Sequence, residues 1–111
     1  MSSRSIPKNH WCDELDSFSR EHEGWRVDVR VLSARGDVRT EAHGLPLVGV
    51  SCDAPNSGRI AVLAGDRTDD HLTHEIANAV AVDIERGEGS ERVRIRAADG
   101  SETSVDFKAS Q

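Results

Sequence analysis

The chain has 111 residues, of which 36% are hydrophobic and only 4% aromatic, and its formal net charge is -6. A chain of this length usually forms one domain, so we treat residues 1–111 as a single domain with one core. The acidic balance argues against nucleic acid and against an anionic membrane surface as partners. The longest apolar run, residues 60–64, is too short to cross a bilayer. Residues 1–10 contain no secretory signal, so we expect a cytoplasmic protein.

The first predicted element is an amphipathic helix over residues 8–22. Trp11, Leu15 and Phe18 recur at helical spacing and should form its buried face. Asn9 is the expected N-terminal cap. Residues 1–6, ahead of this helix, are expected to be flexible.

Residues 25–43 predict a β-hairpin because apolar and polar residues alternate along both halves. A two-residue turn at Arg35-Gly36 would place Val29 opposite Ala42 and Val31 opposite Thr40. In the same register His43 would face Asp28 on the outer side of the sheet.

Residues 91–109 predict a second hairpin. Parity selects a three-residue turn, 98–100, which places Val93 opposite Val105 and Ile95 opposite Thr103, with Gly100 in a left-handed conformation. The arginines of this segment would then line a solvated outer face and pair with acidic residues. They are Arg92, Arg94 and Arg96.

The segment between the hairpins adds further strands. Val48, Val50 and Cys52 alternate, and residues 59–65 are apolar on both faces, which is typical of a covered strand. We therefore expect an α+β fold: an N-terminal helix packed on a mostly antiparallel, curled sheet or small open barrel of about six strands within residues 25–108.

Residues 69–85 allow two local structures. As a helix, the segment would place Leu72, Ile76 and Val80 on one side. As a loop followed by a strand, it would place Val80, Val82 and Ile84 on one face.

The polar residues that could form a binding site are Asp53, Asp70, His71 and His74. A stable zinc site needs three or four ligands, and the spacing here is HxxHE and not HExxH. We therefore predict no metal and no cofactor, and expect the imidazoles and carboxylates to cap backbone groups in a loop.

The two cysteines, Cys12 and Cys52, are far apart and lack CxxC spacing. In a cytoplasmic protein they are expected to be reduced, although a single disulfide stays open as an alternative. The sequence contains no nucleophile elbow and no phosphate-binding glycine loop, so no catalytic residue is predicted and whether the chain is an enzyme stays open.

Several phrases carry a resemblance to a known family. "GLPLVGVSCD" at 44–53 and "DDHLTHEIAN" at 69–78 are the most specific, and "FSREHEGW" at 18–25 supports them. They resemble a bacterial family of short proteins, domain of unknown function 5335, over nearly the whole chain. That family often has a proline after the asparagine, where Ala79 stands here. The resemblance favours loop and strand over helix for residues 79–85, and it implies no activity, substrate or cofactor.

These observations favour a non-enzymatic interaction or regulatory module. Its partner is an unknown protein, and a homodimer through a sheet edge or face is one form of this hypothesis. The alternative is a ligand- or metal-binding, even hydrolytic, site around Asp53 and Asp70, His71 and His74.

Overall fold

The computed structural model describes residues 2–52, 58–65, 72–87 and 90–109. Its regular elements are β1 (Ser2–Ile6), a 3-10 turn η1 (Lys8–His10), α1 (Trp11–Glu21), β2 (Arg26–Leu32), β3 (Val38–Cys52), β4 (Ile60–Ala64), β5 (Leu72–Ile76), β6 (Ala79–Arg86), β7 (Ser90–Ala97) and β8 (Glu102–Lys108). The fold is α+β, as predicted, but eight strands replace the six expected.

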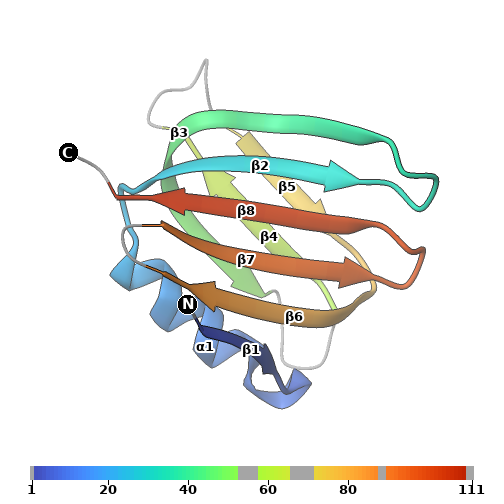
Figure 1. Ribbon diagram of the computed structural model, residues 1–111. Helices are drawn as coiled ribbons and strands as arrows, with labels where there is room; N and C mark the ends of the chain where they lie inside the picture. Colours follow the sequence, from blue (N-terminus) through green and yellow to red (C-terminus); the bar gives the residue numbers. More distant parts are fainter. Residues whose placement is uncertain (1, 53–57, 66–71, 88–89, 110–111) are drawn as a thin grey trace.

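All strands belong to one antiparallel sheet in the order β1-β6-β7-β8-β2-β3-β4-β5, which is open and not closed into a barrel. The long strand β3 pairs with β2 through its first half and with β4 through its second half. The sheet therefore folds over on itself at β3. Its front layer is β1, β6, β7, β8 and β2, and its back layer is β4 and β5 (Figure 1).

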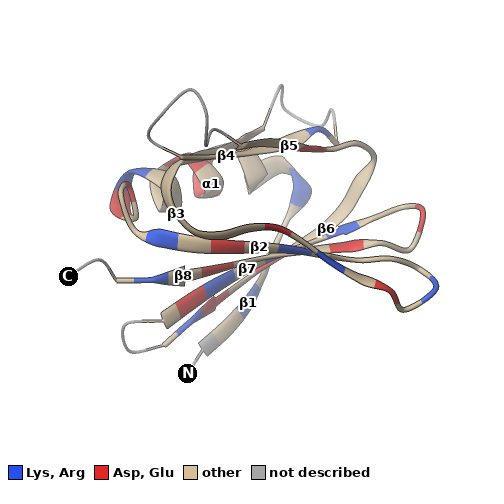
Figure 2. Ribbon diagram, turned by 90° about the horizontal axis from the view of Figure 1, so that it is seen from above, with Lys and Arg blue, Asp and Glu red and all other residues tan. Residues whose placement is uncertain are grey.

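Helix α1 lies between the two layers at one end of the molecule (Figure 2). Trp11, Leu15 and Phe18 are its buried residues, which confirms the predicted apolar face. Phe18 meets Phe107 of β8 edge to face, with ring centroids 4.9 Å apart. The Ser19 hydroxyl accepts a hydrogen bond from the Val50 N–H of β3 at 2.7 Å. One face of α1 thus closes the core of the curled sheet.

The start of the chain differs from its prediction. Residues 2–6 are not a loose lead-in but the edge strand β1, paired with β6 from Ser2↔Arg86 to Ile6↔Val82. The α-helix begins at Trp11, later than predicted, because Lys8–His10 form a 3-10 turn. Asn9 lies inside that turn and does not cap the helix, whose N-cap is His10.

The β2–β3 hairpin is present, but its turn was predicted wrongly. Ser33 N–H donates to Asp37 O at 2.8 Å, which leaves a three-residue loop, 34–36, with Gly36 at φ 95°. Near the turn Val31 therefore pairs with Arg39 and not with Thr40. A bulge on β3 then adds one residue and restores the predicted pair Val29↔Ala42.

The β7–β8 hairpin is as predicted, with Val93↔Val105, Ile95↔Thr103 and Gly100 at φ 89°. Its outer face is charged. Arg92 contacts Glu85 and Asp106, Arg94 contacts Glu85 at 3.0 Å, and Arg96 faces Glu102. Blue and red segments accordingly lie beside one another on the front layer (Figure 2). This confirms the solvated, acid-paired reading of the three arginines.

Leu72–Ile76 and Ala79–Arg86 form strands, so the helical alternative is wrong. Of the region expected to be a polar loop, Leu72–Ile76 instead form β5. A register shift between Ala79 and Ala81 turns Val80 outward, 56% exposed, while Ala79, Val82 and Ile84 are buried. Val48 is likewise turned out, 49% exposed, at a register shift between Leu47 and Gly49.

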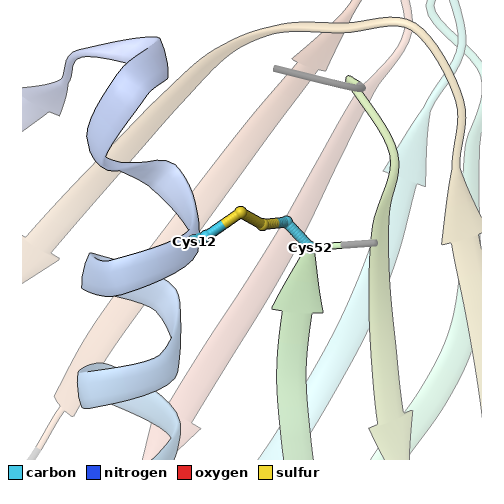
Figure 3. Close-up of a disulfide and its surroundings, with 2 residues drawn as sticks. All are labelled: Cys12 and Cys52. Carbon is cyan, nitrogen blue, oxygen red and sulfur yellow. A yellow bond between two sulfur atoms is a disulfide. The ribbon is translucent and has the colours of Figure 1, made fainter. Parts of the chain in front are cut away.

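Cys12 and Cys52 form a disulfide that ties the first turn of α1 to the end of β3, with Cα atoms 5.2 Å apart (Figure 3). The expectation of two reduced thiols is therefore wrong. Spacing along the chain could not reveal this pair, because the fold-back of β3 creates the proximity. Among the described helices, α1 has only 11 residues and is too short and polar to span a membrane.

Candidate functional site

Strand β5 forms one edge of the sheet. It pairs with β4 from Ile60↔Ile76 to Ala64↔Leu72, and no strand in the described part of the chain pairs with its other side. Its side chains alternate, with Thr73 and Glu75 exposed and Leu72, His74 and Ile76 turned toward the interior. Strand β5 therefore combines a sheet edge with side chains on two different faces.

A polar hollow of about 250 Å³ opens on the inner side of β5, where the back layer meets the tip of the β7–β8 hairpin. We call it the mouth hollow. Its polar lining residues are His74, Glu75, Asn78, Asp99, Ser101 and Thr103. It contains acceptors, hydroxyls and an amide but no lysine or arginine, so a hydrogen-bond donor or a cation would suit it best.

His74 joins the two layers at this hollow. Its Nε2 lies 3.3 Å from the Thr103 hydroxyl of β8, and Thr103 is itself buried. Burial lowers the pKa of His74; the nearby Glu41 opposes that shift and Arg39 adds to it. A lowered pKa leaves the imidazole neutral at pH 7, so it can donate through one ring nitrogen and accept through the other.

The rim of the mouth hollow is held in place by backbone hydrogen bonds. Asn78 adopts a left-handed conformation, φ 57°, and its carbonyl accepts the Ala98 N–H at 2.9 Å. The Ala79 N–H donates to Gly58 O at 2.8 Å, a bond that proline at this position could not make. Opposite, hydrogen bonds from the hydroxyl and N–H of Ser101 lower the pKa of Asp99.

A second hollow, of about 350 Å³, lies on the other side of β5, and we call it the outer hollow. Its polar lining residues are Ser51, Arg59 and Glu75, and its floor includes Ala61. Ser51, Ala61 and Glu75 are neighbours across β3, β4 and β5, so this hollow lies over the small side chain of Ala61. Both hollows share residues 75–77.

Of the four predicted binding residues, the structure describes only His74, which does line a hollow. Asp53, Asp70 and His71 lie outside the described residues. Among the residues described, no group of three or more His, Cys, Asp and Glu side chains is placed to hold a metal ion. Thr103, Asn78 and Ser101 were not predicted as site residues, because only the meeting of the two layers brings them to His74.

A second histidine, His22, is 2% exposed and lies at the other end of the molecule. Its Nδ1 lies 2.7 Å from Phe18 O, and its Nε2 contacts the Glu91 carboxylate of β7. The ring stacks on Phe18, with centroids 3.9 Å apart. Because both ring nitrogens are already engaged, His22 is not placed to act as a general base or a metal ligand.

Comparison with known proteins identifies the family of this chain. The model of a family described as a family of unknown function, DUF5335, matches residues 2–111, so the chain belongs to that family. No curated protein and no solved structure matches the chain.

Proposed function

We propose that this chain is a non-enzymatic binding module that holds an extended segment of a protein partner along β5. The observation that carries the proposal is the pair of hollows on either side of one sheet edge, which share residues 75–77. A strand added to an edge gains affinity from backbone hydrogen bonds, and it gains specificity from side chains that alternate between the two faces. A hollow on each face supports that mode of binding.

The chemistry of the described side chains favours binding over catalysis. His22 uses both nitrogens internally. The hydroxyl beside His74 belongs to Thr103, which is only 3% exposed and is therefore poorly placed to attack a substrate. A nucleophile must be within reach of both its base and its substrate.

The experiment is a selection of displayed random peptides on the purified protein, followed by backbone NMR with a selected peptide. We expect the amide shifts of Leu72–Ile76 and the ring shifts of His74 to move on binding. Ala77 is exposed and lines both hollows, so the large side chain of Ala77→Tyr should weaken binding by filling one of them. Ala109→Tyr, at an exposed alanine outside both hollows, is the matched control. Shifts that avoid β5, or equal affinities of the two variants, contradict the proposal.

The second candidate is a small polar ligand in the mouth hollow. It is favoured by the neutral imidazole of His74 beside the acidic and amide groups of the rim. The other residues predicted for this alternative, Asp53, Asp70 and His71, lie outside the described residues and stay a prediction. Titration with small amines and with Zn²⁺, read at the His74 ring resonances, tests it. A ring that responds to peptide but to neither of these probes leaves only the strand-addition proposal.

A further inference from the structure

The two edges of the sheet differ in how they are protected against pairing. The β1 edge carries Arg4 at its centre, whose guanidinium pairs with Glu14 of α1 at 2.9 Å. The Ser5 hydroxyl of β1 bonds to Asp83 of the neighbouring strand. Sheet edges are commonly blunted by such a charged side chain. A symmetric β1–β1 pair centred on Arg4 would set two guanidinium groups opposite each other, which disfavours it.

The β5 edge has a different composition. Residues 72–76, Leu-Thr-His-Glu-Ile, contain no lysine, arginine or proline, and the one acid, Glu75, lies on the exposed outer face. Among the described residues, β5 therefore lacks the usual devices that block pairing with another strand.

The β5 sequence is complementary to itself when reversed. In an antiparallel pair of two β5 strands centred on His74, Leu72 of one copy lies opposite Ile76 of the other on the inner face. On the outer face Thr73 of one copy lies opposite Glu75 of the other. Apolar residues thus meet apolar residues, and the two glutamates do not face each other.

We propose that the segment bound along β5 is the β5 strand of a second copy of this chain, in the antiparallel register centred on His74. This inference rests on the proposed function, since it names the partner of the same edge. The two His74 side chains then lie at the two-fold axis. Because burial lowers the pKa of His74, these two rings are neutral at pH 7 and do not repel.

The dimer should be weak. Each copy carries a net charge of -6, so long-range repulsion opposes association and added salt should strengthen it. Five residues of strand bury little surface compared with a stable dimer. We therefore expect dissociation constants between about 10 µM and 1 mM.

The test is sedimentation equilibrium of the full chain up to about 1 mM, the weak end of that range. Thr73 is exposed, so its replacement spares the core. Thr73→Lys places an ammonium opposite Glu75 of the other copy, twice per dimer, and should strengthen the dimer. Thr73→Glu places a second carboxylate opposite each Glu75 and should weaken the dimer. Each change should be about two- to thirty-fold in Kd, from two cross-strand pairs.

Net charge needs its own control. Thr40→Lys and Thr40→Glu make the same charge changes on an exposed residue of β3. Equal effects at positions 40 and 73 would overturn the register. A wild-type chain that stays monomeric up to about 1 mM overturns the second copy as occupant. The proposed function still stands in that case if a selected peptide shifts the amides of β5, and it fails separately if none does.

Discussion

The hydrogen-bond partners of the buried His22 show where its ring hydrogens lie. A carbonyl oxygen only accepts hydrogen bonds, so the His22 Nδ1 that faces Phe18 O must carry a hydrogen. Nε2 faces a carboxylate oxygen of Glu91, so a second hydrogen lies between these two atoms. Arg86 also reaches Glu91, at 3.5 Å. The pair is therefore a hydrogen-bonded contact between the end of α1 and β7, and removing either member should lower the stability of the fold.

This geometry predicts different outcomes for two changes at Glu91. Glu91→Gln keeps a polar group that can donate to Nε2 of the neutral ring, and should cost less than about 1 kcal/mol. Glu91→Leu leaves a buried ring nitrogen unpaired and should cost about 1 to 3 kcal/mol. Urea unfolding measures both. Glu102→Ala, whose partner Arg96 is 4.0 Å away at the surface, is the control and should change stability by under about 1 kcal/mol. Equal losses for Gln and Leu would contradict the hydrogen-bond account.

His74 predicts a pH dependence of stability. Its folded pKa lies below the ordinary value of about 6.5 because of burial. Above a pH of about 6.5 the His74 ring is neutral in both the folded and the unfolded chain, and its contribution to stability is fully present. As the pH falls through about 6.5 the unfolded chain binds the proton first, so stability declines until the folded pKa is reached.

The measurement is urea unfolding of wild type and His74→Gln at about pH 7.5 and about pH 5.5, on either side of the ordinary histidine pKa. Glutamine can still bond Thr103 but does not titrate. Wild type should lose more stability between the two pH values than the variant does. If the two proteins decline in parallel, another group is responsible.

At the scale of elements, the two hairpins show what local sequence could and could not specify. In 91–109 only one turn length brings Val93 to Val105, and the structure has that turn. In 25–43 the two-residue turn also matched apolar to apolar, yet the structure has three loop residues plus a bulge that restores Val29↔Ala42. The longer turn and the bulge shift the register in opposite directions and leave the same core pair. The alternation of apolar and polar residues could therefore not distinguish this arrangement from a two-residue turn without a bulge.

The disulfide predicts a measurable loss of stability when it is reduced. It closes a separation of 40 residues between α1 and β3, and closing a loop of that length in the unfolded chain is worth about 3 to 4 kcal/mol. We expect a reducing agent to lower the melting temperature of wild type and leave Cys12→Ser/Cys52→Ser unaffected. The double variant should still fold, because Phe18 and Ser19 hold α1 independently. Wild type indifferent to reductant would show that the bond does not form.

At the scale of the whole molecule, the arrangement of layers was beyond what the sequence could predict. The sequence allowed His74 to lie on a helix or in a loop, and neither reading could place Thr103 beside it. That contact depends on β3 bending enough to carry β4 and β5 over the front layer. The same bend brings Cys52 to Cys12. Contacts between layers connect residues distant in the chain, and no local pattern encodes them.

The N-terminal edge strand provides a prediction for the integrity of the whole sheet. Ile6 is buried, and its carbonyl accepts the Trp11 indole N–H at 2.8 Å. Deleting residues 1–6 should therefore cost about 3 to 5 kcal/mol, from one buried isoleucine and one unpaired indole donor.

The same deletion leaves residues 82–86 of β6 unpaired on the side away from β7, which adds a new open edge to the sheet. We therefore expect the truncated chain to aggregate on mild heating, as measured by light scattering, in addition to unfolding at lower urea. Arg4→Ala is the control, because it removes the exposed ion pair but keeps the strand, and it should change stability by less than about 1 kcal/mol. A truncated chain as stable as wild type would mean that β1 adds nothing to the sheet, and that the core is complete from Trp11 onward.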